Sequence, residues 1–60
     1  MTTFTDGKSY YYSVINHFRY EIKQVTDGKE TVLSHHKTSE LAENELIKLA
    51  KKNGWILVNN

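Results

Sequence analysis

The sequence predicts an α+β fold in which a mostly antiparallel sheet carries a single helix on one face. Three observations support this: two aromatic, β-branched segments precede an Asp-Gly turn, an amphipathic segment has capping residues at both ends, and a short apolar segment follows a glycine. The predicted order is β-β-β-α-β, and the expected architecture is a two-layer sandwich. We expect residues 1–9 to be a flexible leader and residues 10–60 to form a single β-β-β-α-β domain.

The first two strands are predicted over residues 10–15 and 18–25, which are rich in tyrosine and in β-branched side chains. The second segment alternates between polar and apolar residues, so one of its faces is apolar: Phe18, Tyr20 and Ile22. We expect that face to cover the core.

The third strand follows Asp27-Gly28, a favoured pair for a two-residue type I′ hairpin turn. Such a turn would align Leu33 with the apolar face of the preceding strand. The expected pairs are Val25 with Glu30, Lys23 with Val32, Ile22 with Leu33, and Tyr20 with His35.

The turn between the first two strands has two possible forms. A two-residue Asn16-His17 loop would turn Tyr11, Ser13 and Ile15 inward, whereas a three-residue loop over 15–17 would turn Tyr10, Tyr12 and Val14 inward. A slip of one residue exchanges the two faces. We prefer the longer loop because it buries more carbon and uses asparagine where the left-handed conformation costs least. Tyr11 is then predicted to lie on the outer face.

A helix is predicted to begin at Thr38 or Ser39, either of which can cap it, and to end at Asn53-Gly54. Between these caps, apolar residues recur at helical spacing: Leu41, Ala42, Leu46, Leu49 and Ala50. Residues 55–58 (WILV) are short and apolar, which is typical of a buried strand. This strand could pair beside either the first or the third predicted strand.

The composition excludes several classes of protein. The chain has no cysteine, so neither a disulfide nor a thiolate zinc site can stabilise its 60 residues. A formal net charge of +1 is far from the basic balance of a dedicated nucleic-acid binder. No apolar run approaches the length of about 20 residues that a membrane helix needs. The N-terminus lacks the features of a signal peptide, so a cytoplasmic location is expected.

No catalytic or metal site is predicted. The acidic residues Glu40, Glu43 and Glu45 fall in the first turns of the helix, where they are favoured by its dipole. His35 and His36 are adjacent on a strand, so their rings should point to opposite faces. One sheet and one helix also leave little volume for a ligand pocket of about 300 Å³ or more. We therefore expect neither an enzyme nor a cofactor.

The remaining candidates form a partner-binding surface. Tyrosine and arginine are favoured in interfaces, and an exposed edge strand can accept a strand from a partner or a second copy. An ordinary exposed sheet face and a core tryptophan explain the same residues without a partner. The predicted partner-binding residues are Tyr11, Arg19, Glu21, Lys23 and His36 on the outer face, with Trp55 at the start of the last strand.

A four-residue spacing of small and apolar residues along the helix supports a resemblance: Thr38, Ala42, Leu46, Ala50 and Gly54. Over residues 18–58 the chain resembles families of tiny bacterial and phage β-β-α-β proteins. Some of those proteins are phage-encoded inhibitors that bind a host enzyme, such as RNA polymerase or a defence nuclease. The resemblance implies a protein that acts by occupying a surface of a larger one.

A second resemblance is to the arm-binding domains of tyrosine integrases, which also run strand-strand-strand-helix and read DNA through the sheet face. It implies that Arg19, Lys23 and Lys29 face DNA, although Glu21 interrupts that surface. The leading hypothesis is a small non-enzymatic interaction protein, encoded by a phage or mobile element, that modulates or inhibits a larger host protein. The alternatives are a nucleic-acid-binding domain and a structural homodimer, and no membrane partner is expected.

Overall fold

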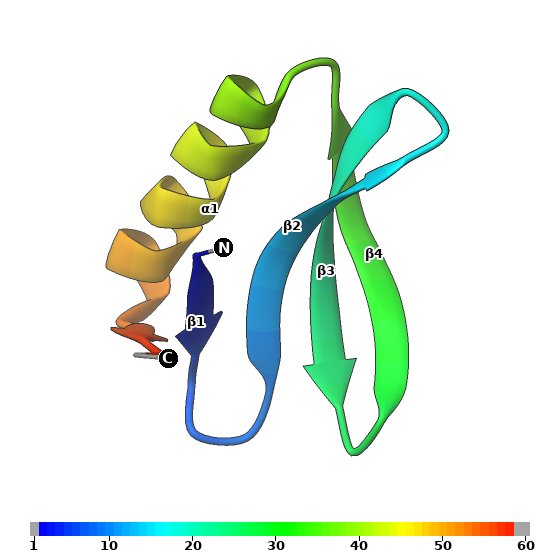
Figure 1. Ribbon diagram of the computed structural model, residues 1–60. Coiled ribbons are helices and arrows are strands. Elements are labelled where there is room, and N and C mark those ends of the chain that lie inside the picture. The colour runs from blue at the N-terminus through cyan, green and yellow to red at the C-terminus, as the bar shows by residue number, and fades with distance from the viewer. Residues whose placement is uncertain (1, 59–60) are drawn as a thin grey trace.

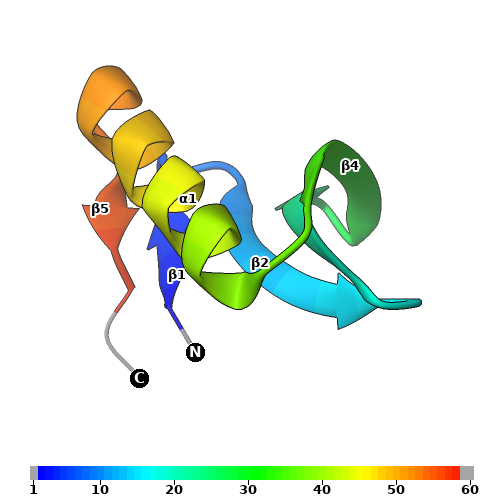
Figure 2. The same cartoon turned by 90° about the horizontal axis from the view of Figure 1, so that it is seen from above.

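The computed structural model describes residues 2–58. Five strands form one antiparallel sheet in the order β4-β3-β2-β1-β5, with the helix packed on one face (Figure 1). Figure 2 shows the two layers from above. The predicted α+β class is confirmed. The elements are β1 (Thr3–Thr5), β2 (Tyr10–Asn16), β3 (Arg19–Thr26), β4 (Lys29–His36), α1 (Ser39–Asn53) and β5 (Ile56–Leu57).

Strand β1 was not predicted. Residues 1–9 were expected to be a flexible leader, but Thr3–Thr5 lies between β2 and β5 within the sheet. Pairing with β2 on one side and β5 on the other holds these three residues in the sheet, and Phe4 packs against the core cluster. Asp6 orders the following loop, since its Oδ1 accepts hydrogen bonds from the backbone of Lys8 at 2.9 Å and of Ser9 at 2.7 Å. The leader prediction is therefore wrong for these residues.

The β2–β3 turn differs from both predicted loops. Asn16 pairs with Arg19, so the turn consists of His17 and Phe18, which have φ values of 50° and 68°. Positive φ at both positions is the type I′ geometry, which matches the right-handed twist of paired strands. This register turns Tyr11 toward the helix and leaves it 4% exposed. The prediction that Tyr11 lies on the outer face, with Tyr10 and Tyr12 inside, is wrong.

The β3–β4 hairpin confirms the Asp27-Gly28 turn, in which φ is 52° and 80°. Beyond Lys23, which pairs with Val32 as expected, a bulge shifts the register by one residue. Leu33 becomes the extra residue, and Tyr20 pairs with His36 instead of His35. A bulge leaves one residue unpaired and increases the local twist. Its main consequence is that His35 comes to lie opposite Glu21.

The core lies between α1 and the inner face of the sheet. Ile22 and Leu46 are fully buried, and the rings of Tyr11 and Trp55 stack with centroids 3.6 Å apart at an interplanar angle of 10°. Stacked aromatic pairs contribute about 0.5–1.5 kcal/mol beyond their buried area. The core cluster is thus Tyr11, Ile22 and Leu46, and the partly buried side chains of Trp55, Phe4 and Leu49 pack against it.

The helix begins and ends as predicted. Oγ1 of Thr38 accepts a hydrogen bond from the backbone N–H of Leu41 at 3.1 Å, and Gly54 adopts the left-handed conformation with φ 72°. The buried residues are Ala42, Leu46 and Ala50. Leu41, which was predicted to share their stripe, is 52% exposed. Since it lies in the first turn, it stands at the end of α1 and outside the core.

Strand β5 forms an edge of the sheet and pairs with β1 alone. It was expected beside the first or the third predicted strand, but its neighbour is β1, which was not predicted. Ile56 and Leu57 are 70% and 56% exposed, so the prediction of a buried strand is wrong for these two residues. Trp55, just before them, is the residue that reaches the core.

Candidate functional site

The β2–β3 turn presents an aromatic ring to solvent. Phe18 is 95% exposed and has φ 68°, although the alternating pattern of β3 predicted it on the core face. Left-handed backbone costs a residue with a Cβ about 1–2 kcal/mol, whereas glycine adopts it freely. Glycine would therefore adopt the backbone conformation of Phe18 at a lower energetic cost, and almost none of the phenyl ring is buried. Neither backbone geometry nor core packing explains this residue.

A groove lies beside this turn. It opens where the turn, the end of β4 and the first turn of α1 meet, and its cavity volume is about 500 Å³. This falls within the range of about 300–1,000 Å³ that is common for ligand sites. The expectation that the fold leaves little volume for a site of this size is therefore wrong. The groove is lined by Phe18, Arg19, His35, His36, Lys37 and Leu41.

The lining of this groove combines positive charge with apolar surface. Arg19 and Lys37 carry permanent charges at neutral pH, and the two histidines add imidazole donors. Lys37 also precedes the N-terminus of α1, where the helix dipole places partial positive charge. Phe18 and Leu41 supply the apolar part of the wall. The groove therefore suits a group that is both anionic and partly apolar.

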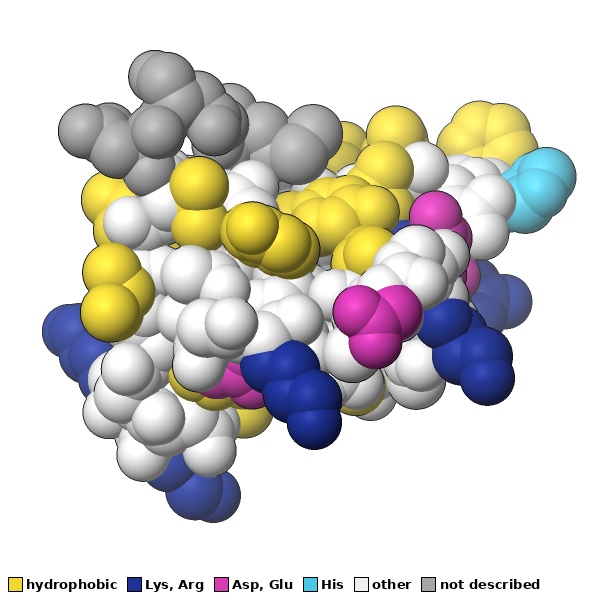
Figure 3. Space-filling view, turned by 90° about the horizontal axis from the view of Figure 1, so that it is seen from below, with side chains coloured by type: hydrophobic (Ala, Val, Ile, Leu, Met, Phe, Trp, Pro, Cys, Tyr) yellow, Lys and Arg dark blue, Asp and Glu magenta, His cyan; other side chains and the backbone are white. Residues whose placement is uncertain are grey.

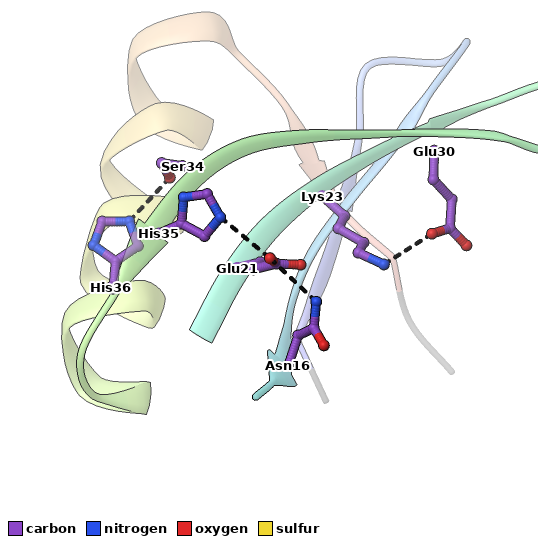
Figure 4. A network of polar contacts seen from close by, with 7 residues as sticks. All are labelled: Asn16, Glu21, Lys23, Glu30, Ser34, His35 and His36. Carbon is purple, nitrogen blue, oxygen red and sulfur yellow. Dashed lines mark hydrogen bonds and ion pairs between the residues drawn. The ribbon is translucent and has the colours of Figure 1, made fainter. Parts of the chain in front are cut away.

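Glu21 contacts His35, one of the residues that line the groove (Figure 4). Its Oε2 lies 3.2 Å from Nε2 of His35 and accepts a hydrogen bond from Nδ2 of Asn16 at 3.3 Å. Glu21 was predicted to be exposed, but it is only 7% exposed, and its Oε1 has no hydrogen-bond partner among residues 2–58. Because the bulge in β4 brings His35 opposite Glu21, the pair depends on that irregularity. Its effect is to hold one imidazole at the groove wall.

A smaller hollow of about 210 Å³ adjoins the groove at Arg19. It is lined by Asn16, His17, Arg19 and Glu21. Arg19 lines both hollows, so the two share one residue. The turn and the residues that flank it therefore form one continuous polar and aromatic surface.

The predicted site residues divide into three groups. Arg19 and His36 line the groove, while Glu21 contacts His35, another lining residue. Lys23 lies further along β3, where Nζ forms an ion pair with Oε1 of Glu30 at 2.8 Å, and this hydrogen bond raises the pKa of Lys23. Tyr11 and Trp55 stack on each other in the core. The structure therefore does not bring the six together on one sheet face.

Sequence reasoning missed the residue that dominates this surface. Phe18 was assigned to the core because it fits the alternation of β3, and Leu41 because it fits the periodicity of α1. Lys37 and His35 were assigned no role in binding. A usable signal was present in Asn16-His17-Phe18-Arg19, where no glycine is available for a turn that needs positive φ at both central positions.

Other exposed hydrophobic side chains lie away from the groove. Tyr10 is 51% exposed and Val32 43% exposed on the outer sheet face, and Ile56 is 70% exposed at its edge. Figure 3, the view from below, shows hydrophobic side chains gathered in a band at the surface, with basic and acidic side chains mostly to one side of it. These residues are part of regular strands, where partial exposure of apolar side chains is common. They lack the unusual backbone geometry of Phe18.

Comparison with protein-family models, with curated proteins and with solved structures finds no match for this chain. Within residues 2–58, no three acidic or histidine side chains are grouped so that they could hold a metal ion. Over the same stretch, no helix has both the length and the apolar character to cross a membrane.

Proposed function

We propose that this chain is a small non-enzymatic interaction protein that binds a larger protein through the β2–β3 turn and the groove beside it. The observation that carries the proposal is the 95% exposure of Phe18 on left-handed backbone. Unfavourable backbone geometry lowers the stability of a free domain of this size, and a ring this exposed contributes almost nothing to offset that cost. A partner that buries the ring would account for both.

The neighbours of Phe18 support binding over catalysis. Arg19 follows it directly, and aromatic and arginine side chains are the ones that most often dominate binding energy at interfaces. The Glu21–His35 contact resembles the orientation of a general base. The side chains that line the groove, however, include neither a carboxylate nor a hydroxyl that could act with His35. This composition favours recognition of a ligand over acid–base chemistry.

The proposed partner is a larger host protein whose activity the chain modulates or inhibits. Phage or mobile-element origin is part of the proposal and rests on the resemblance of residues 18–58 to tiny phage proteins. The alternative, nucleic-acid binding through the sheet face, is less supported. Its aromatic residue, Tyr11, is 4% exposed, and Lys23 pairs with Glu30.

Affinity capture from a bacterial lysate tests the proposal. The bait would be the wild-type chain, the variant Phe18→Gly and the matched control Ile56→Ala, which removes an exposed apolar side chain from β5. We expect one protein to be retained by the wild type and the control, with and without nuclease, and to be lost from Phe18→Gly. Equal retention by all three baits would contradict the proposal. Loss on nuclease treatment would favour the nucleic-acid alternative.

A further inference from the structure

The charge of the groove departs from the charge of the whole chain. Eight basic and seven acidic residues nearly balance overall, yet the lining of the groove contains two permanent cations, two imidazoles and no carboxylate. The adjoining strands β3 and β4 carry Glu21 and Glu30, and α1 carries Glu40, Glu43 and Glu45, but none of these carboxylates lines the groove. Glu21 is buried, with Oε2 occupied by Asn16 and His35. Glu40 lies in the first turn of α1 but does not line the groove.

The position of the charges around the apolar wall points to a peptide. Arg19 follows the β2–β3 turn and Lys37 follows β4, so the two cations come from different elements. Phe18 and Leu41 line the same groove and offer apolar surface that is 95% and 52% exposed. A segment with carboxylates on either side of an apolar side chain would satisfy all four residues at once. Neither a simple anion nor a neutral apolar segment would do so.

Nucleic acid fits this surface less well than an acidic peptide. The affinity of a protein for DNA rests on neutralising several phosphates with lysine and arginine, and its dependence on salt grows with the number of phosphates contacted. The groove supplies two permanent cations. A phosphate backbone that continued along the outer face would approach Glu30, whose side chain is 55% exposed. The charge is therefore local, and its extent matches a short acidic segment.

We infer that the groove binds an acidic peptide segment of the partner, with its carboxylates on Arg19 and Lys37 and an apolar side chain between Phe18 and Leu41. This inference rests on the proposed function and specifies the chemistry of the partner. The Glu21–His35 contact fixes one wall of the site before the segment arrives. Preorganisation of this kind lowers the entropic cost of binding.

Fluorescence anisotropy with a defined probe tests the inference. The probe is a fluorescein-labelled peptide in which glutamate alternates with leucine, and the control peptide carries glutamine in place of glutamate. We expect the acidic probe to bind, the neutral control not to bind, and affinity for the probe to fall between about 50 and 200 mM salt. Equal binding of both peptides would overturn the inference. Tighter binding of a single-stranded oligonucleotide than of the acidic probe would also overturn it.

Matched charge variants locate the binding site. Arg19→Gln and Lys37→Gln each remove one positive charge from the groove, and Lys52→Gln removes one from the last turn of α1. We expect each groove variant to weaken binding of the probe about fivefold, the effect of one partly exposed ion pair, and the helix variant to leave it unchanged. Equal weakening by all three would show attraction to net charge alone and would refute the site. Thermal unfolding of each variant by circular dichroism confirms that it is folded.

The two proposals can fail separately. If the lysate partner depends on Phe18 but the acidic probe does not bind, the proposed function stands and the peptide chemistry is wrong. If the probe binds through Arg19 and Lys37 but no lysate protein depends on Phe18, the groove binds acidic segments and the proposed role of the turn is wrong.

Discussion

The variant Phe18→Gly should raise the stability of the free protein. A residue with a Cβ at left-handed φ costs about 1–2 kcal/mol, and glycine removes that cost. Glycine also lowers the free energy of unfolding by about 0.5–1 kcal/mol, because it makes the unfolded chain more flexible. The ring itself contributes little, because 5% of it is buried (100 − 95), or about 10 Å² of a side chain of about 200 Å². At about 25 cal/mol per Å², this is worth about 0.25 kcal/mol.

The net expectation is a gain of about 0.5 kcal/mol in the free energy of unfolding. For a domain of this size, that corresponds to a rise in Tm of about 2–4 °C. Urea and thermal unfolding followed by circular dichroism measure both quantities. Phe18→Ala is the matched control, because it removes the ring but keeps the Cβ at left-handed φ. It should leave stability almost unchanged or slightly lower, so the difference between the two variants isolates the backbone contribution.

Loss of stability would refute this reasoning. A phenylalanine that packed in the core, as the alternating pattern of β3 suggested, would cost about 3–5 kcal/mol on truncation. A fall of more than about 1 kcal/mol in both variants would therefore show that the ring packs against the protein in solution. The proposed function would then lose its supporting observation.

Three further predictions concern the fold. Hydrogen bonds from the backbone of Ser9 and Lys8, and from the hydroxyl of Tyr11, lower the pKa of Asp6 below its usual 3.8. Because this pKa is lower in the folded state, ionised Asp6 stabilises the protein above pH 3.8, and the stabilisation is lost as the pH falls through the folded-state pKa. Asp6→Asn should therefore make the fall of the urea midpoint with decreasing pH less steep. An unchanged pH dependence would contradict this prediction. Trp55→Ala should lower the free energy of unfolding by less than the about 3–5 kcal/mol of a fully buried ring, because the ring stacked on Tyr11 is only partly buried; a variant of unchanged stability that lost only partner binding would show that Trp55 acts at an interface. Gly54→Ala should cost about 1 kcal/mol in urea denaturation, since φ is 72° while no atom lies within 4 Å of the added Cβ; no loss would show that α1 can end without left-handed backbone.

Local signals predicted the helix and one hairpin. Thr38 and Gly54 mark the ends of α1 through contacts within a few residues, and Asp27-Gly28 fixes its turn through its own φ preferences. Such features depend on nearby atoms, so they can be recognised in the sequence. The overall class of the fold followed from them.

The features that failed are decided by contacts between distant segments. Thr3–Thr5 is too short to show periodicity, and it forms a strand because β2 and β5 pair with it on either side. The bulge at Leu33 depends on how β4 packs beside β3, and no glycine or proline marks it in the sequence. These two features set the register around Glu21 and His35. The contact between Glu21 and His35 beside the groove could therefore not be predicted from the local sequence.

Two of the groove residues, Arg19 and His36, were predicted to bind a partner, but on a different surface from the one they line. Arg19 and His36 were selected as members of a sheet face, but they meet at the end of the sheet beside α1. Phe18 was assigned to the core because a regular alternation was extended one residue too far into the turn. A residue that breaks a local rule, in this case a large ring at positive φ, is a common sign of a functional position.

The pairing of β1 with β5 has a consequence for synthesis of the chain. The strand nearest the N-terminus completes its hydrogen bonds only when the segment after α1 has left the ribosome, since β5 is its neighbour on one side. Until then, β1 presents an open edge, and Trp55 is not yet available to cover Tyr11. Unpaired edges and uncovered aromatic rings are what chaperones and aggregating chains recognise. Nascent chains that stop before Trp55 should therefore be held by chaperones or degraded, although they already contain every residue of the groove.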